Sequence, residues 1–255
     1  MVRLIALAIL FINSCYAQTV ILACGDSANP PFIIEGGTKL VDERPGVSIE
    51  MLKLVEEKLK VKFTFLRMPW QRGLKAIAAN KIDGLFHSSF KPECLAIGVY
   101  PMQNGKLDIS KRMLNWSYVL YKLNSSPLNW DGMQFTELDG AIGATRGYAV
   151  VDQLVKLSVD VEEVENTLQN MEKLVAGRIA GVADLETMGD FILKTYSPKY
   201  DRVVKVNPPL RTKAYFLMLS HQFVKQSPKL SEEIWATIEL IRESDKYNEL
   251  LRKYM

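Results

Sequence analysis

Apolar residues in the first hundred positions follow two alternating periods. Short runs typical of strands occur at Val20–Ala23, Val61–Leu66 and Ile82–Phe86. Between these runs, apolar residues recur every three or four positions, first from Val47 to Leu59 and then around Leu74. That spacing is typical of amphipathic helices that bury one face. The pattern therefore predicts the order β-α-β-α-β.

A second series of the same kind follows. Strands are predicted at Ser117–Tyr121, Ala141–Ala144 and Ile179–Ala183, with one amphipathic helix after Ala149 and another that Asn166 or Thr167 caps. Alternating strands and helices of this length indicate a layered α/β fold.

The last fifty residues predict a return to the first series. Two strands, Val203–Val206 and Tyr215–Leu219, flank a Pro-Pro pair that marks the crossing back. One long helix, starting at Ser227-Pro228 and carrying apolar residues to Ile241, is predicted to end the chain.

The N-terminus has a different pattern. A short Met-Val-Arg start precedes an apolar run from Leu4 to Ile12, and Cys15-Tyr16-Ala17 places small residues where a signal peptidase cuts. A helix needs about 20 residues to span a bilayer, and this run is shorter. We expect residues 1–17 to be a secretory signal, with lipidation at Cys15 and a buried N-terminal element as the weaker alternatives.

Composition narrows the choice of partner. The chain has 255 residues, 48% of them hydrophobic, and removal of Arg3 with the signal lowers the net charge from +3 to +2. This length suits two compact lobes or one large domain. The basic residues are scattered, so nucleic acid is not an expected partner.

Familiar catalytic devices are missing from the sequence. It has no phosphate-binding glycine motif, no GxSxG and no HExxH, and its two histidines, His87 and His221, give little basis for a metal site. We therefore expect no cofactor, no metal and no catalytic residue. After signal removal two cysteines remain, Cys24 and Cys94, and the sequence leaves open whether they form a disulfide or stay free.

Polar and aromatic groups gather where predicted strands end. In an open α/β fold, ligands bind at such strand-to-loop junctions. The candidates for ligand contact are Asp26, Phe32, Trp70, His87, Ser88, Ser89, Cys94, Thr145, Arg146, Gly147, Tyr148, Asp184 and Glu186.

The order of several segments carries a family resemblance over essentially the whole mature chain. The chain resembles the bacterial extracellular solute-binding proteins of family 3, the type II periplasmic proteins of polar amino acid uptake. The segments are Asn29–Phe32, Gly46–Leu52, Met68–Leu74, Asn80–Gly84, Ser89–Glu93, Gly143–Tyr148, Leu174–Ile179 and Tyr247–Tyr254.

This resemblance implies a two-lobed α/β fold in which two crossing strands form a hinge. The expected division is lobe I over 18–114, lobe II over 115–209 and a return to lobe I over 210–255. It further implies a monomeric periplasmic protein that captures a small polar solute between the lobes. A membrane permease of an ABC transporter, or a sensor, would be its partner, and it would have no enzymatic activity.

Three positions depart from the family pattern. Cys94 stands where amino-acid binders usually carry an arginine that clamps the ligand carboxylate, and a thiol offers no fixed charge. Ala180 replaces an aspartate, and Leu185 aligns with the aspartate that meets the ligand amine. We hypothesise a ligand that is not a standard α-amino acid, or a carboxylate held by another cation such as Arg146.

Two other functions remain open at this stage. The same fold serves cyclohexadienyl dehydratase, for which Asp184 or Glu186 would act as general acid or base. A ligand-free scaffold or interaction protein that has lost its binding site would also explain Cys94 and Leu185.

Overall fold

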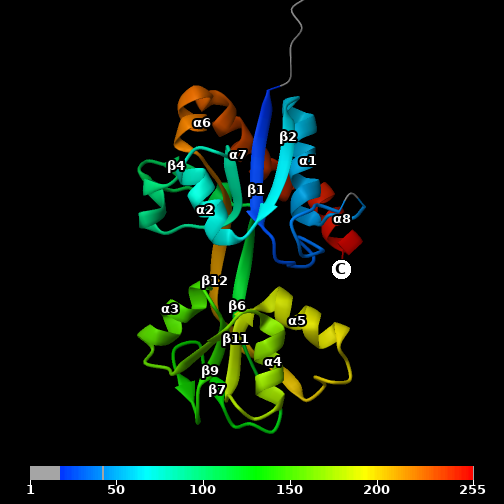
Figure 1. Cartoon of the computed structure of the whole chain (residues 1–255), viewed down its shortest axis with the longest axis vertical. Coiled ribbons are helices and arrows are strands. Elements are labelled where there is room, and N and C mark those ends of the chain that lie inside the picture. The colour runs from blue at the N-terminus through cyan, green and yellow to red at the C-terminus, as the bar shows by residue number, and fades with distance from the viewer. Residues whose placement is uncertain (1–17, 42, 255) are drawn as a thin grey trace, which may run out of the picture.

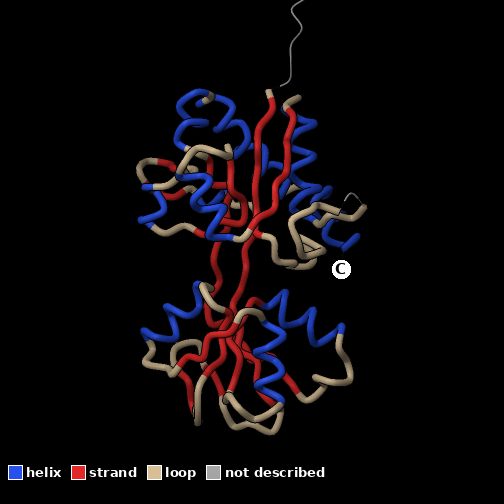
Figure 2. The backbone as a smooth tube through the Cα atoms, viewed as in Figure 1, coloured by secondary structure: helices blue, strands red, loops and turns tan. Residues whose placement is uncertain are grey.

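The computed structural model describes residues 18–41 and 43–254, so the predicted signal over 1–17 lies outside the described residues. Figure 1 shows two lobes, one above the other, with strands β6 and β12 running between them. In Figure 2 each lobe has strands at its centre and helices around them. The two-lobed α/β fold expected from the sequence is confirmed.

One sheet of eight strands passes through both lobes, in the order β10-β9-β11-β6-β12-β3-β1-β2. The strands β2, β1 and β3 belong to lobe I, whereas β11, β9 and β10 belong to lobe II. In β12 the pairing with β3 begins at Tyr215, and in β6 the pairing with β11 begins at Tyr118. Between these two levels only β6 and β12 continue, paired with each other. The lobes are therefore linked by a short two-stranded ribbon.

Lobe I begins with the predicted β-α-β-α-β order. Its first three strands are parallel, and α1 buries the face that its apolar spacing predicted. The elements are β1 (Thr19–Gly25), α1 (Val47–Leu59), β2 (Lys62–Met68), α2 (Trp70–Ala78) and β3 (Gly84–Ser89). Strand β3 starts two residues later than predicted.

Small elements complete this lobe before the chain leaves it along β6 (Leu114–Leu123). They are the 3-10 helices η1 (Pro92–Ala96) and η2 (Ile109–Lys111) and the strands β4 (Met102–Gln103) and β5 (Lys106–Leu107).

Lobe II carries the second series. Asn166 caps α4 as predicted, because its side chain accepts a hydrogen bond from the Gln169 backbone N–H at 3.0 Å. The elements are β7 (Asn129–Trp130), β8 (Phe135–Thr136), β9 (Ile142–Thr145), α3 (Ala149–Lys156), β10 (Val161–Val164), α4 (Thr167–Val175), β11 (Gly181–Leu185) and α5 (Glu186–Thr195).

The prediction of two separate strands around the Pro-Pro pair is wrong. A single strand, β12 (Val203–Leu219), covers both, and its pairing with β6 shifts between Val206 and Arg211. Proline has no N–H to donate to a ladder, so the pairing breaks there while the backbone stays extended.

The prediction of one terminal helix is also wrong. The chain ends in α6 (His221–Gln226), α7 (Pro228–Arg242) and α8 (Asp245–Tyr254). The main chain turns between α7 and α8, where the Ser244 hydroxyl donates to the Ile241 carbonyl at 2.6 Å. Helix α7 thus ends at Arg242, and α8 begins at Asp245.

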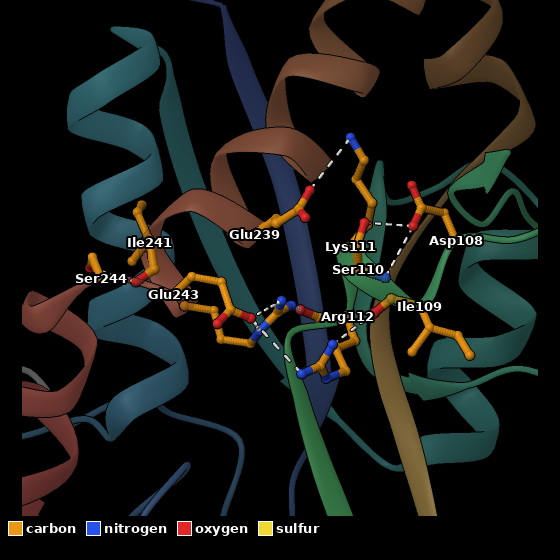
Figure 3. A network of polar contacts seen from close by, with 10 residues as sticks. Asp108, Ile109, Ser110, Lys111, Arg112, Glu239, Ile241, Glu243 and Ser244 are labelled. Carbon is orange, nitrogen blue, oxygen red and sulfur yellow. Dashed lines mark hydrogen bonds and ion pairs between the residues drawn. The ribbon is translucent and has the colours of Figure 1, made fainter.

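A polar network attaches α7 to the start of β6 (Figure 3). Lys111 pairs with Glu239 at 3.9 Å, and the Arg242 guanidinium donates to the Arg112 carbonyl and to Glu243. Through Glu239 and Arg242, α7 holds the segment that leads into β6.

No helix in the described part of the chain is both long enough and apolar enough to cross a membrane.

Candidate functional site

A cavity of about 610 Å³ lies between the lobes, within the size range of small-molecule sites. Lobe I contributes Gly25, Ser27, Ala28, Asn29, Ile33, Trp70, Gln71, Leu74, His87, Ser88, Ser89, Lys91 and Cys94. The crossing strands contribute Trp116, Tyr118 and Tyr215, and lobe II contributes Gly147, Tyr148, Ala149, Val151, Asp152, Glu163 and Leu185.

Aromatic side chains from the crossing strands form the floor of this cavity. The Trp116 ring lies 4.5 Å from Tyr215 and 4.7 Å from His87, centroid to centroid. The hydroxyls of Tyr118 and Tyr215 are 3.2 Å apart, and the Tyr118 ring packs on Tyr148 of lobe II at 6.1 Å. Flat faces of this kind enclose a small solute and attract a cationic group.

His87 takes an unusual backbone conformation at the edge of the floor. Its φ is 63°, in the left-handed region that costs a non-glycine residue about 1 kcal/mol or more. The pairing of β3 with β12 shifts here, so that Phe86 and His87 together lie opposite Leu217. This bulge turns the His87 ring onto Trp116, and bulges of this kind occur next to binding sites.

The imidazole of His87 is neutral at ordinary pH. Burial lowers its pKa to about 3, and the Ser48 hydroxyl lies 2.7 Å from Nε2. His87 is therefore suited to hydrogen bonding and packing rather than to holding a charge.

A buried arginine fixes the loop that forms the lobe I wall. Arg67 is 6% exposed and donates to the carbonyls of Gly25, Ser27 and Glu35 at 3.4, 3.2 and 2.5 Å. These bonds stabilise the guanidinium without a carboxylate and hold the loop that carries Asn29.

Two contacts join the lobes across the cavity. The Thr187 hydroxyl, in the first turn of α5, donates to Asn29 Oδ1 at 2.8 Å. On the other side, Lys91 forms an ion pair with Asp152 of α3 at 2.9 Å. The lobes therefore contact each other around the cavity.

A buried carboxylate lies beneath the lobe II wall. Asp184 is fully buried, and its two oxygens accept hydrogen bonds from Thr145 Oγ1 and from the Leu185 backbone N–H, each at 2.7 Å. Burial outweighs these bonds and raises the pKa of Asp184 to about 6. Leu185, not Asp184, faces the cavity.

The structure brings seven of the thirteen candidate residues together as cavity lining: Trp70, His87, Ser88, Ser89, Cys94, Gly147 and Tyr148.

The other six candidates are placed differently. Phe32 packs behind Trp116 at 5.8 Å, and the Asp26 carbonyl binds the Gly37 N–H at 2.7 Å. Arg146 is exposed and forms an ion pair with Glu165, while Glu186 pairs with Lys205 at 2.7 Å. Thr145 and Asp184 bind each other beneath the wall. None of the six lines the cavity.

The aromatic residues of the cavity floor were not among the ligand contacts predicted from the sequence. Tyr118 and Tyr215 lie on predicted strands, and Trp116 directly precedes the strand predicted at Ser117–Tyr121. The alternation Asn115-Trp116-Ser117-Tyr118 places the Trp116 and Tyr118 rings on one face. That aromatic alternation was the available signal.

Both described cysteines are free: Cys24 is buried, which raises its thiol pKa to about 12, and Cys94 is half-buried. Within residues 18–41 and 43–254, no three His, Cys, Asp or Glu side chains cluster as metal ligands would.

Comparison with known proteins gives the chain a family. The family model of the bacterial extracellular solute-binding proteins, family 3, matches residues 21–255. No curated protein matches the chain.

Solved structures share the fold at low identity. The GluR0 ligand-binding core from Nostoc punctiforme in complex with L-glutamate has a TM-score of 0.69 and 16% identity, covering 92% of this chain and 99% of its own. The substrate binding protein of an amino acid ABC transporter has a TM-score of 0.66 and 16% identity, with 93% and 99% covered. The ancestral amino acid-binding protein AncCDT-1, a precursor of cyclohexadienyl dehydratase, has a TM-score of 0.66 and 14% identity, with 93% and 95% covered.

Proposed function

Because the chain belongs to the bacterial extracellular solute-binding proteins of family 3, we propose that it captures a small polar, amino-acid-like solute between its two lobes. The observation that carries this proposal is the cavity of about 610 Å³, to which both lobes and the crossing strands contribute. Its aromatic floor offers flat faces, and Ser88, Ser89 and Asn29 offer polar groups at its wall.

The cavity residues named from the sequence are part of this proposal, together with the aromatic floor. We propose that Trp70, Ser89 and Tyr148 contact the solute directly, since they line the cavity from both lobes. The division into lobe I over 18–114 and 210–255 and lobe II over 115–209 likewise stays a prediction.

We further propose that the protein works in the periplasm as a monomer. It would pass its solute to the permease of an ABC transporter or to a sensor. Support comes from the family, which consists of extracellular solute-binding proteins, and from the similarity to the substrate binding protein of an amino acid ABC transporter.

An enzyme of the cyclohexadienyl dehydratase type is the second candidate, favoured by the similarity to AncCDT-1. It needs an acid that reaches the substrate. Asp184 is fully buried beneath the wall and Glu186 is paired with Lys205, so neither offers a free carboxyl group to the cavity. These positions favour binding without chemistry.

Calorimetry of the protein from Gln18 onward tests the proposal. The probes are the twenty L-amino acids, their carboxamides and small polyamines, with prephenate added to detect turnover. We expect one class of probe to bind, and Tyr148→Ala to weaken that binding at least about tenfold, because the ring on the cavity wall is lost.

The matched control is Tyr196→Ala, which removes an exposed tyrosine of lobe II. It should leave affinity unchanged. The proposal fails if no probe binds, or if prephenate is consumed at a rate that Asp184→Asn abolishes.

A further inference from the structure

The middle of the two-stranded link carries a lysine on its cavity side. Lys213 of β12 lies directly opposite Trp116 of β6, and Arg211 lies opposite Tyr118. Residues opposite each other in an antiparallel pair project from the same face of the sheet. Trp116 and Tyr118 line the cavity, so Lys213 projects toward the same side.

Lys213 is not itself a lining residue of the cavity, but it contacts one. Its Nζ lies 3.4 Å from the hydroxyl oxygen of Ser89, which lines the cavity, and the side chain is half-buried. Cys94 and Asp152, two other lining residues, are near enough to act on its charge.

Lys213 has no carboxylate partner in the part of the chain that the structure describes. Of the other cations near the cavity, Lys91 pairs with Asp152, Arg146 pairs with Glu165, and Arg211 is exposed. Within residues 18–41 and 43–254, no carboxylate oxygen lies within 4.0 Å of the Lys213 ammonium.

The surroundings of Lys213 are themselves basic. Burial is the main cause that lowers its pKa to about 8, and Arg211 on β12 and Lys91 before η1 act in the same direction. Cys94 of η1 and Asp152 of α3 oppose them. An anion bound here would relieve this repulsion.

We propose that Lys213, with the hydroxyl of Ser89, binds the carboxylate of the solute. It would thereby supply the positive charge that is missing where Cys94 stands. The solute is then a small carboxylate-bearing molecule whose other end lies over the aromatic floor. This inference rests on the proposed function and narrows its ligand class.

A lysine would recognise the carboxylate differently from an arginine. The ammonium is a compact point charge, whereas the guanidinium binds a carboxylate with two parallel hydrogen bonds in one plane. We therefore expect this site to fix the orientation of the carboxylate less strictly, and to accept carboxylates without an α-amino group.

Calorimetry with the amino acids, carboxamides and polyamines, together with simple hydroxy and keto acids, tests the inference. We expect binding of one or more carboxylates and at least tenfold weaker binding of the matching carboxamide. Lys213→Met should weaken the carboxylate at least about tenfold, while Lys213→Arg should retain most of the affinity. The control Lys225→Met removes an exposed lysine of lobe I that forms no ion pair with a described residue, and it should change nothing.

A pH series provides a second readout. As the pH rises through about 8, the Lys213 ammonium loses its proton, so affinity for the carboxylate should fall in the wild type. The Lys213→Arg variant should hold its affinity over the same range, because arginine stays charged.

The outcomes separate the two proposals. Carboxylate binding that Lys213→Met leaves intact overturns the inference and keeps the proposed function. Binding of uncharged or cationic probes alone also overturns the inference and keeps the proposed function. If no probe binds, both proposals fail.

Discussion

The buried carboxylate of Asp184 predicts a measurable dependence of stability on pH. Its two hydrogen bonds, from Thr145 and from the Leu185 backbone, do not offset the cost of burying its charge, and its pKa rises from 3.8 to about 6. The folded protein therefore holds this proton more tightly than the unfolded chain does. The stabilising contribution is fully present below about pH 4 and is lost as the pH rises through about 6.

The magnitude follows from the difference between the two pKa values. At about 1.4 kcal/mol per pH unit, a rise of about two units corresponds to about 3 kcal/mol. An asparagine at this position has nearly the same shape and no charge to bury. We expect the free energy of unfolding of Asp184→Asn, minus that of the wild type, to increase by about 2–3 kcal/mol from about pH 4 to about pH 7.

Urea unfolding followed by tryptophan fluorescence at a series of pH values measures this difference. Asp152→Asn is the control, because the Lys91 ammonium lowers the pKa of Asp152 and a small slope of opposite sign is expected. If the curves of Asp184→Asn and the wild type stay parallel between pH 4 and pH 7, the reasoning about burial is refuted.

Urea unfolding also measures the effects of three other substitutions, which remove a hydrogen bond, crowd a helix and remove an ion pair. Ser48→Ala leaves His87 Nε2 without its partner at 2.7 Å and should cost about 1–3 kcal/mol; an unchanged stability would contradict this. Gly189→Ala places a Cβ 2.2 Å from the ring of Tyr121 and should destabilise by about 1–3 kcal/mol or more, although alanine favours helices; a gain in stability would show that the ring yields. Lys91→Met removes an exposed ion pair across the cavity, so its cost should stay below about 1 kcal/mol and vanish in about 1 M salt, and a larger loss at both salt concentrations would be inconsistent with solvent screening.

Local pattern predicted the elements that bury one face. The spacing of Met51 and Val55 indicated α1, and the side chain of Asn166 caps α4 as its position in the sequence suggested. Strand β10 was not predicted, because its sequence Val-Glu-Glu-Val contains no apolar run. It lies at the edge of the sheet, where both glutamates are exposed.

The cavity was harder to predict because its lining depends on sheet register. Asp184 and Leu185 are neighbours in sequence, but only the structure shows that the leucine faces the cavity and that the aspartate is buried behind it. The position of Lys213 near the cavity could not be predicted from the sequence, since it depends on which β6 residue lies opposite it. The left-handed backbone of His87 likewise arises from a shift between two strands far apart in the sequence.

The path of β12 has a consequence for the order in which the protein can fold during synthesis. Lobe II is built from one continuous segment, from β6 to the first half of β12. Strand β3 of lobe I already pairs with β1, but its other edge stays unpaired until the second half of β12 has been made, and α1 lacks the helix α7 that packs on it. The lobe that emerges first is therefore completed last, and the middle of the chain is the first part that can form a complete lobe.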